Sequence, residues 1–578
     1  MTSVTAKVQP LRLSGLRARS ILALLLAGFA VLTGRAVYLQ GLHDDFLQQQ
    51  GESRYGRIVE MPATRGMISD RNNEPLAIST PVESVWASPA NAEINPQQLA
   101  QLARLLELQP AEITQRLSGA GSDFVYLKRQ LPPELAQQVA ALDIPGVFLQ
   151  REYRRYYPAS ESAAQVVGMT DIDGKGQEGL ELAFDDRVSG QPGSRRVIKD
   201  RLGHIVEDVA SIRAAKPGQD LTLSIDTNIQ YLAYRELKKA VIANHAKAGS
   251  VVVLDVQTGE VLAMANLPSY NPNNREQVDP HNKRNRTVTD LFEPGSTLKP
   301  FTAAAALESG LFGPDTMIQT APGWMRVGSR TIHDVDPSHA LTVAQVIQKS
   351  SNVGAAKIGL AMPAEKLWEI FNDVGFGVPL RSDFPGEVSG RLRAYHNWRP
   401  IDQAAISYGY GISVSLLQLA RAYLIFATDG EIKPVSLIKQ DAPVAAVRVI
   451  DAKVAREVRK MLELVVEPGG TAPHAQIIGY QVAGKTGTAH KLGSGGEYAT
   501  DKFIASFVGF APASAPRLIV AVTIDEPSAG QYYGGAVAAP VFSAVTAGAL
   551  RILSVPTDAP LNNVVMPPPS APVIREET

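Results

Sequence analysis

The stretch SVVVLDVQTGEVLAMANL (residues 250–267) decides the fold class of this chain. Its two runs of apolar and β-branched residues are joined by a tight turn, a pattern that predicts a β-hairpin and hence an antiparallel pair of strands. Residues 517–525, RLIVAVTID, predict a further strand. Residues 221–241, before the hairpin, predict a helix that Asp226 or Thr227 caps. The sequence therefore predicts an α+β fold in which helices flank an antiparallel sheet.

Composition limits the classes of function. The chain has 578 residues, of which 45% are hydrophobic and 20% charged, so it can form several folded domains. Its 56 basic residues are balanced by 57 acidic ones and no arginine-rich tract is present, which argues against a nucleic-acid partner. The absence of cysteine excludes disulfides, thiolate metal sites and a thiol nucleophile.

The N-terminus has the features of a membrane anchor. Four basic residues precede the apolar run ILALLLAGFAVLTG of residues 21–34, namely Lys7, Arg12, Arg17 and Arg19. We expect an uncleaved anchor at residues 21–39, because the apolar pattern continues beyond Ala30, where a signal peptidase could cut. A signal peptide that ends at Ala30 is the alternative. Basic residues on the N-terminal side place residues 1–20 in the cytoplasm and nearly all of the chain outside it.

Residues 479–490, GYQVAGKTGTAH, begin with the phosphate-loop pattern of nucleotide-binding proteins. Asp525 and Glu526, at the end of a predicted strand, could hold Mg²⁺ in such a site. A phosphate loop must open a helix, however, and the glycine-rich segment after Thr486 opposes one, since each helical glycine costs about 1 kcal/mol. The alternation in residues 480–483 predicts a strand instead. Nucleotide binding is therefore the minority alternative.

The segment FEPGSTLKPF (residues 292–301) places Ser296 and Lys299 three residues apart. We expect Ser296 or Thr297 to cap a helix with Pro300 in its first turn, which brings the lysine to the same face as the serine. A partly buried lysine can lose its proton and act as the base for a serine nucleophile. Taken alone, this spacing more often marks a helix cap and a solvated charge.

Two further motifs follow in the sequence. IQKSSNVG contains Ser350 and Asn352, and the phosphate-loop-like stretch contains Lys485, Thr486, Gly487 and Thr488. Alone, the first is typical of a turn and the second of an exposed strand edge. In this order, however, Ser-x-x-Lys, Ser-x-Asn and Lys-Thr-Gly form the set of acyl-serine enzymes, which include penicillin-binding proteins and serine β-lactamases.

The chain resembles class B penicillin-binding proteins, particularly the division-specific D,D-transpeptidases, over about residues 20–555. The stretches that carry the resemblance are RNRTVTDLFEPGSTLKPF (284–301), KSSNVG (349–354), SYGYGISVSLLQLARAY (407–423) and AGKTGTA (483–489). Three earlier stretches resemble the family's N-terminal module: RGMISDRNNEPLA (65–77), REYRRYYPASESAAQVVG (151–168) and QEGLE (177–181). One departure is Ser160-Glu161, where the family often has glycine.

The composition and hydropathy of the chain, together with the resemblance, predict five parts. These are a cytoplasmic tail (1–20), a transmembrane anchor (21–39), an elongated mixed pedestal of the dimerisation type (40–215), a transpeptidase domain (216–556) and a Pro-rich disordered tail (557–578). The expected fold class is thus α+β, with a transmembrane helix, a pedestal and an antiparallel-sheet domain flanked by helices.

The resemblance also implies the chemistry. Ser296 would attack the carbonyl of the penultimate D-Ala of a peptidoglycan stem peptide, with Lys299 as the general base and Ser350 passing a proton to the leaving amine. The resulting acyl-enzyme would transfer the stem to an amine of a neighbouring one. The substrate-binding residues would be Asn352, Lys485, Thr486, Gly487 and Thr488, with Lys485 as the receptor of the terminal carboxylate. Neither a cofactor nor a metal is implied.

The expected partners are peptidoglycan stem peptides, β-lactam antibiotics and divisome membrane proteins, including a lipid II polymerase. The expected location is the bacterial inner membrane, with one span and a periplasmic catalytic domain. Two rival functions share the motifs. A β-lactamase would need a further means of activating water, and its reaction would leave the long pedestal unexplained. A membrane-anchored β-lactam sensor or septal scaffold is the alternative outside the enzymes.

Two polar segments resemble metal sites but fail as such. DIDGKG (residues 171–176) begins a calcium-loop pattern, yet Leu182 stands where a bidentate glutamate is required. HDVDPSH (residues 333–339) groups two histidines and two aspartates, but Pro337 prevents one helical face from presenting them. We therefore expect a polar loop and a surface turn.

Overall fold

The computed structural model describes residues 14–39, 56–118, 124–199, 205–335, 340–492 and 497–566. The chain folds into two compact units. Unit 1 is drawn from residues 1–63, 82–152 and 191–216, and unit 2 from residues 64–81, 153–190 and 217–578. The segment predicted as the pedestal, residues 40–215, therefore contributes to both units.

Helix α1 (Gly15–Val37) is the apolar N-terminal helix. Its 23 residues span about 35 Å at 1.5 Å per residue, enough to cross the roughly 30 Å hydrocarbon core of a bilayer. None of its residues is buried. Such a helix suggests a membrane anchor, and it begins before residue 21, where the predicted span starts. The adjoining residues 1–13 and 40–55 lie outside the described part of the chain.

Unit 1 contains a small core of helices and strands. Helices α3 (Pro96–Leu106), α4 (Pro110–Leu117) and α5 (Pro133–Ala140) accompany strand β4 (Val125–Leu131), which pairs antiparallel with the end of β3 (Pro75–Ala87). Their apolar faces meet in a cluster that includes the fully buried Val85, Leu102, Leu106, Ile113 and Leu127. A separate antiparallel sheet has the order β1 (Gly56–Met61), β8 (Gly193–Lys199) and β9 (Ile205–Arg213).

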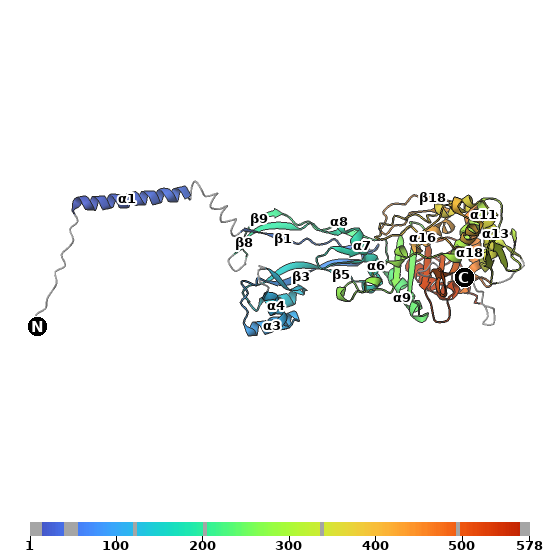
Figure 1. Ribbon diagram of the computed structural model, residues 1–578, viewed down its shortest axis with the longest axis horizontal. Coiled ribbons are helices and arrows are strands. Elements are labelled where there is room, and N and C mark those ends of the chain that lie inside the picture. The colour runs from blue at the N-terminus through green and yellow to red at the C-terminus, as the bar shows by residue number, and fades with distance from the viewer. Residues whose placement is uncertain are drawn as a thin grey trace. The chain divides into compact units, whose positions relative to one another are not determined.

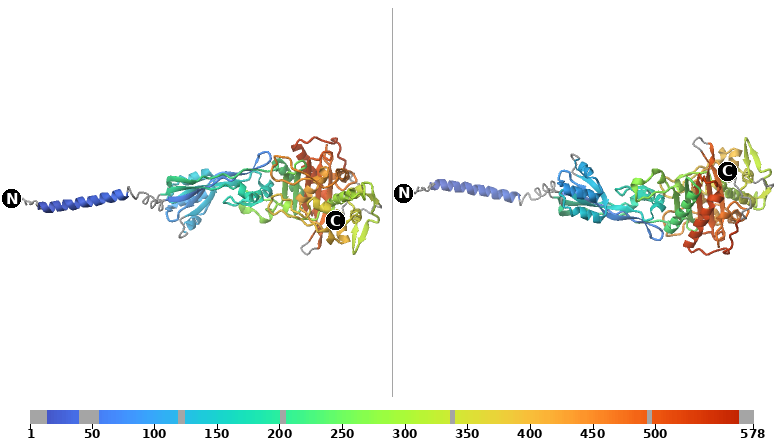
Figure 2. Two further views of the ribbon diagram at one scale, coloured as in Figure 1. Left: turned by 90° about the horizontal axis from the view of Figure 1, so that it is seen from above. Right: turned by 90° about the horizontal axis from the view of Figure 1, so that it is seen from below.

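Unit 2 is built on a five-stranded antiparallel sheet. Its order is β12 (Val261–Leu267), β11 (Ala248–Asp255), β21 (Leu518–Asp525), β20 (Tyr498–Ala511) and β19 (Ala483–Leu492). The predicted hairpin is confirmed as β11–β12, and the predicted late strand as β21. Figure 2 shows the late orange-to-red strands beside this green hairpin.

Helices cover both faces of this sheet, as predicted. Helix α9 (Thr227–Ala243) is capped by Asp226, whose carboxylate accepts from the amides of Asn228 and Ile229. It packs on β12 and on helix α20 (Ala539–Ile552), and helix α16 (Leu416–Ala422) packs on β11 and β21. A Cβ added to Gly249 of β11 would lie 2.8 Å from Leu237 of α9. Because neighbouring strand residues point to opposite faces, Ala248 and Ser250 face the α16 side.

The helices that carry the motifs form a third group in unit 2. The turn η5 (Gly295–Leu298) leads into α11 (Lys299–Glu308), and α12 (Val343–Lys349) is followed by α13 (Asn352–Leu360). Helix α11 packs against α13 and against α18 (Ala452–Val466), and the three lie together in Figure 1.

Shorter elements complete unit 2. They are β2 (Ile68–Ser69), η2 (Ser160–Ser162), α6 (Ala164–Val167), β6 (Met169–Thr170), β7 (Gly176–Glu178), α7 (Gly179–Ala183), α8 (Asp185–Val188), β10 (Leu221–Thr222), η3 (Arg275–Gln277), η4 (Pro280–Asn282), α10 (Arg286–Thr289), β13 (Met317–Gln319), β14 (Trp324–Val327), β15 (Arg330–His333), β16 (Ala340–Thr342), α14 (Ala364–Asp373), η6 (Tyr395–Asn397), α15 (Pro400–Ile406), α17 (Leu424–Ala427), β17 (Glu431–Ile432), β18 (Val447–Arg448), η7 (Pro473–Ala475) and α19 (Gly534–Val537). Strand β5 (Val147–Tyr156) pairs with β3.

Two details bear on the sequence analysis. Ser160, which stands where the related family often has glycine, has a φ of 46°, in the left-handed region that glycine adopts most easily.

Residues 557–566, predicted as part of the disordered tail, make hydrogen bonds to the body of unit 2. The Asn563 side chain, for example, donates to the carbonyls of Ile477 and Tyr480. Residues 567–578 lie outside the described residues.

Candidate active site

Ser296 lies inside the turn η5, one residue after Gly295. The predicted helix cap at Ser296 or Thr297 is wrong, because both residues lie within η5 and Leu298 is the residue that precedes α11. The Thr297 hydroxyl donates instead to the Pro294 carbonyl at 2.7 Å. The Ser296 hydroxyl is thereby placed to accept a hydrogen bond from Lys299 Nζ at 2.9 Å. Both side chains are buried.

The Ser350 hydroxyl, from the second motif, connects the Ser296–Lys299 pair to Lys485 of the third motif. Its Oγ accepts from Lys299 Nζ at 3.1 Å and from Lys485 Nζ at 2.9 Å. Lys299 Nζ also donates to the Ser350 carbonyl. Ser350 has a φ of 60°, which costs a non-glycine residue about 1–2 kcal/mol. Strain of this kind persists where the surrounding contacts require it, so the position of Ser350 is strongly determined.

Strand β19 supplies the third motif. Lys485 Nζ donates to Thr486 Oγ1 at 3.1 Å, and that hydroxyl lies 2.7 Å from the Thr471 hydroxyl. Thr488 Oγ1 accepts from the Gly534 amide at 3.1 Å. Gly487 is the point of closest approach, since an added Cβ would lie 2.9 Å from the Pro294 carbonyl oxygen. The absence of a side chain at Gly487 therefore lets β19 pack directly on the turn η5, which contains Ser296.

Asn352 is the first residue of α13 and is buried. Asp334, which the sequence pattern placed only in a surface turn, fixes Asn352 in place. Asp334 accepts hydrogen bonds from the amides of Asn352 at 2.6 Å and Val353 at 3.0 Å, and from the Ser351 hydroxyl at 2.5 Å. A carboxylate at a helix N-terminus is favourable. Because Asp334 lies 18 residues before Asn352, no local sequence signal could have found it.

This arrangement suits acyl transfer through a serine. Lys299 reaches both the Ser296 and the Ser350 hydroxyls, so a proton taken from one can pass to the other. Burial disfavours the charged form of an amine and so favours the neutral form, which can accept a proton. A serine hydroxyl has two acceptor lone pairs and one donor, so Ser350 can receive from both lysines and still donate.

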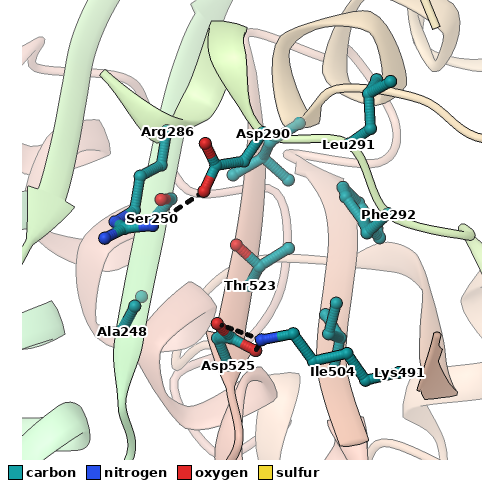
Figure 3. Close-up of a pocket in the computed structure, with 12 residues that line it drawn as sticks. Ala248, Ser250, Arg286, Asp290, Leu291, Phe292, Lys491, Ile504, Thr523 and Asp525 are labelled. Atoms are coloured by element: carbon teal, nitrogen blue, oxygen red, sulfur yellow. Dashed lines mark hydrogen bonds and ion pairs between the residues drawn. The ribbon is translucent and has the colours of Figure 1, made fainter. Parts of the chain in front are cut away.

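The structure is inconsistent with a phosphate loop. Strand β19 begins at Ala483, three residues later than predicted, and continues through Thr486 to Leu492 without opening a helix. The acidic residues that could hold Mg²⁺ under the phosphate-loop alternative form ion pairs instead. Lys491 Nζ lies 2.7 Å from Asp525 Oδ1 and 2.8 Å from Glu526 Oε1, beside a pocket of about 100 Å³ on the α16 side of the sheet (Figure 3).

The two metal-like segments do not form clusters in the described chain. Asp171 accepts from the amides of Asp173 and Lys175, as expected for a polar loop. Asp336 and His339 of the second segment lie outside the described residues. Within the described ranges, no group of three or more histidine, aspartate or glutamate side chains could hold a metal ion.

Comparison with known families gives two matches. Residues 249–547 match the penicillin binding protein transpeptidase domain, and residues 60–223 match the penicillin-binding protein dimerisation domain. These ranges include every residue of the three motifs.

Individual proteins are similar over nearly the whole chain. The probable peptidoglycan D,D-transpeptidase PenA of Neisseria meningitidis (serogroup A, serotype 4A) is 45% identical over 546 residues, which is 94% of each chain. The peptidoglycan D,D-transpeptidase FtsI of Escherichia coli K12 is 42% identical over 93% of this chain and 91% of its own. The apo structure of the TP domain from Burkholderia pseudomallei penicillin-binding protein 3 is 48% identical, with a TM-score of 0.54, and the match covers 58% of this chain and 98% of that one.

Proposed function

The chain belongs to the penicillin-binding proteins and is a peptidoglycan D,D-transpeptidase, and we propose that Ser296 is the residue it acylates, during cross-linking of stem peptides at the division septum. The single observation that carries the assignment is the position of Lys299 Nζ, which lies 2.9 Å from the Ser296 hydroxyl and 3.1 Å from the Ser350 hydroxyl.

In the proposed first step, Lys299 accepts the Ser296 proton while Oγ attacks the carbonyl of the penultimate D-Ala. The backbone amides of Ser296 and Thr488 would receive the oxyanion. The C–N bond then breaks, Ser350 delivers a proton to the amine of the terminal D-Ala, and that residue leaves. In the second step, an amine of a neighbouring stem attacks the ester and restores Ser296.

Lys485 would bind the terminal carboxylate of the stem peptide together with Thr486 and Thr488, while Asn352 holds the peptide amide. The described contacts support this role, since the buried Lys485 Nζ and the Thr486 hydroxyl lie 3.1 Å apart at the site. A lysine with adjacent hydroxyls makes charge-assisted hydrogen bonds to a carboxylate. β-Lactams carry a carboxylate in a comparable position, so the same residues would bind it.

The assignment of Ser296 is tested by labelling. Incubation with a penicillin should add one drug mass to the peptide that contains Ser296, and Ser296→Ala should take up none. Acylation of Ser350, or undiminished labelling of the alanine variant, would show that the nucleophile is another residue. Transpeptidation of purified stem peptides separates this enzyme from a β-lactam sensor with the same acylation chemistry.

We further propose that α1 anchors the chain in the inner membrane with the N-terminus in the cytoplasm and the catalytic domain in the periplasm. The basic residues at positions 7, 12, 17 and 19 support this orientation. The septal role, with divisome membrane proteins and a lipid II polymerase as partners, is proposed on the resemblance of the motifs. A fluorescent fusion should concentrate at midcell, and a fusion spread along the side wall would argue for elongation instead. Mature protein that begins at Val31 would contradict the anchor.

A further inference from the structure

Glu293 connects three segments of the chain at the edge of the candidate active site. It lies three residues before Ser296, and its carboxylate accepts two hydrogen bonds. The Gly411 amide donates to Oε1 at 2.7 Å, and the Tyr498 hydroxyl donates to Oε2 at 2.8 Å. These donors lie 118 and 205 residues away in the sequence, so the contact exists only in the folded protein.

The Gly411 segment packs directly on the nucleophile turn. The Gly295 amide donates to the Gly409 carbonyl at 3.1 Å. A Cβ added to Gly409 would lie 1.9 Å from the Gly295 carbonyl oxygen, so no larger residue fits there without moving the turn. The hydrogen bond from the Gly411 amide to Glu293 therefore connects this segment to the residues that precede Ser296.

Tyr498 is the first residue of β20, the partner strand of β19. The two strands pair antiparallel, with Leu492 opposite Tyr498 and Thr488 opposite Ala505. The middle of β19 already touches the turn, since a Cβ on Gly295 would lie 3.5 Å from the Thr488 carbonyl oxygen. The hairpin is thus held against the turn near Thr488 and again, through Tyr498, at Glu293.

The carboxylate is retained at an energetic cost. Burial raises the pKa of the Glu293 carboxyl above its ordinary value, although the hydrogen bonds from Gly411 and Tyr498 act in the opposite direction. Tyr498, whose hydroxyl donates to this carboxylate, lies 5.7 Å from Tyr410 between ring centroids, and Tyr410 lies at the same distance from Tyr408. A raised carboxyl pKa means that the ionised group lowers folding stability at neutral pH. The two hydrogen bonds therefore offset the partial burial of this carboxylate only in part.

We propose that Glu293 is a positioning residue that holds strand β19 at a set distance from the nucleophile turn, through Tyr498 and Gly411. The separation between the amides of Ser296 and Thr488 depends on this distance, and these amides face the charge that develops in the transition state. Glu293 therefore acts on the rate of acylation more than on the capture of substrate. The inference rests on the proposed role of Ser296.

The test uses Glu293→Gln in the full-length, detergent-solubilised protein, because glutamine keeps the size of the side chain and one acceptor oxygen. Stopped-flow acylation by a penicillin separates the dissociation constant of the initial complex from the acylation rate constant. We expect the rate constant to fall about tenfold, as for the loss of one charge-assisted hydrogen bond, while the dissociation constant stays nearly unchanged. The unfolding temperature at pH 7.5 should equal or exceed that of the wild type, because the cost of the partly buried charge is removed.

Tyr498→Phe is the second variant, and Glu369→Gln on α14, whose partner is Lys366, is the matched control. We expect Tyr498→Phe to reproduce the loss, the double variant to lose little more than either single variant, and the control to match the wild type. Additive losses would overturn the proposal, as would a change confined to the dissociation constant, which would mark a ligand contact. If the unfolding temperature fell together with the acylation rate constant, Glu293 would have a purely structural role, which would also overturn the proposal. Unchanged acylation of Ser296 would contradict this inference alone, whereas wild-type protein unlabelled at Ser296 would contradict the proposed function.

Discussion

Two buried clusters in unit 2 both bring two cations together, but on different acceptors. At the candidate active site, two lysines donate to one hydroxyl. In the second cluster, Arg65 and Arg155 each donate to the Glu181 carboxylate at 2.6 Å, and Arg65 donates to Asp185 at the same distance. The first cluster surrounds a hydroxyl, which can exchange protons. The second pairs the two guanidinium groups with carboxylates, which carry full charges of opposite sign.

The difference follows from the chemistry of the two cations. Burial lowers the pKa of Arg65, but Glu181 and Asp185 outweigh it and raise the pKa above its ordinary value. A guanidinium keeps its charge and binds carboxylates in a fixed geometry, whereas an amine can release its proton when buried. Arginine therefore suits the cluster that holds three segments together, and lysine suits the proton transfer that we propose at Ser296.

The largest expected effect comes from exchanging the two kinds of cation. Lys299→Ala should lower the rate of penicillin acylation about 10²-fold or more, because the general base is lost. Lys299→Arg should lower it as strongly, since a guanidinium does not deprotonate. The matched swap Arg65→Lys should leave the acylation rate of folded protein near that of the wild type. If Lys299→Arg were still acylated at the wild-type rate, the proposed difference between the buried lysine and the buried arginines would be wrong.

The second expected effect is on stability. Glu181→Gln leaves two buried guanidinium groups without their shared carboxylate, which should lower the free energy of unfolding by about 3–5 kcal/mol. Urea denaturation measures this change, and titration of active sites with penicillin corrects the acylation rate for the folded fraction. That corrected rate should be unchanged. A variant with wild-type stability would show that Arg65 and Arg155 do not depend on Glu181.

The third expected effect sharpens the role of the second lysine. Lys485→Ala should weaken acylation by carboxylate-bearing β-lactams by about 1.5–3 kcal/mol, the value of a charge-assisted hydrogen bond. A substrate analogue without the carboxylate should lose much less. Equal losses for both compounds would assign Lys485 to the proton network around Ser350 instead. Saturable Mg²⁺-ATP binding that vanishes in this variant, with acylation unchanged, would restore the phosphate-loop alternative.

The smallest expected effect is the pH dependence of the arginine cluster. Burial favours the neutral form of Asp185, but the Gly176 amide and Arg65 outweigh it and hold the pKa of that carboxyl below its ordinary value. A lowered pKa contributes stability that is present above the ordinary value, about 3.9, and lost as the pH falls through the folded-state value. Unfolding measured between pH 7 and pH 3 should therefore depend less on pH in Asp185→Asn. An unchanged slope would contradict this.

Local features of the fold were predictable because they depend on neighbouring residues. The hairpin of residues 250–267, the strand after Arg517 and the cap at Asp226 all agree with the structure. The start of β19 was not predictable in the same way. The Gly479 amide donates to the Asn563 side chain, which also donates to the Tyr480 carbonyl. These bonds come from a segment more than 80 residues away and keep Tyr480 out of the strand.

The same division applies to the candidate site. The order of the motifs singled out Ser296, Ser350 and Lys485, because each motif is written in consecutive residues. Their convergence was implied only by resemblance, since Lys299 lies 51 residues from Ser350 and Lys485 lies 135 residues from it. The sequence placed Asp334 only in a surface turn and gave Glu293 no role, because a single carboxylate carries no pattern until its distant partners are known.

The amino-acid sequence by itself determined the α+β class, the apolar N-terminal helix and the three motifs that supply the candidate site residues, because these depend on composition and on spacing along the chain. Only the tertiary structure decided which of these groups touch. The three N-terminal stretches that resemble the family contribute Arg65, Arg155 and Glu181 to one ion cluster, and the three motifs contribute two lysines to one serine hydroxyl. Both outcomes require packing of the core to close long loops, and the free energy of that packing depends on many segments together and not on any one of them.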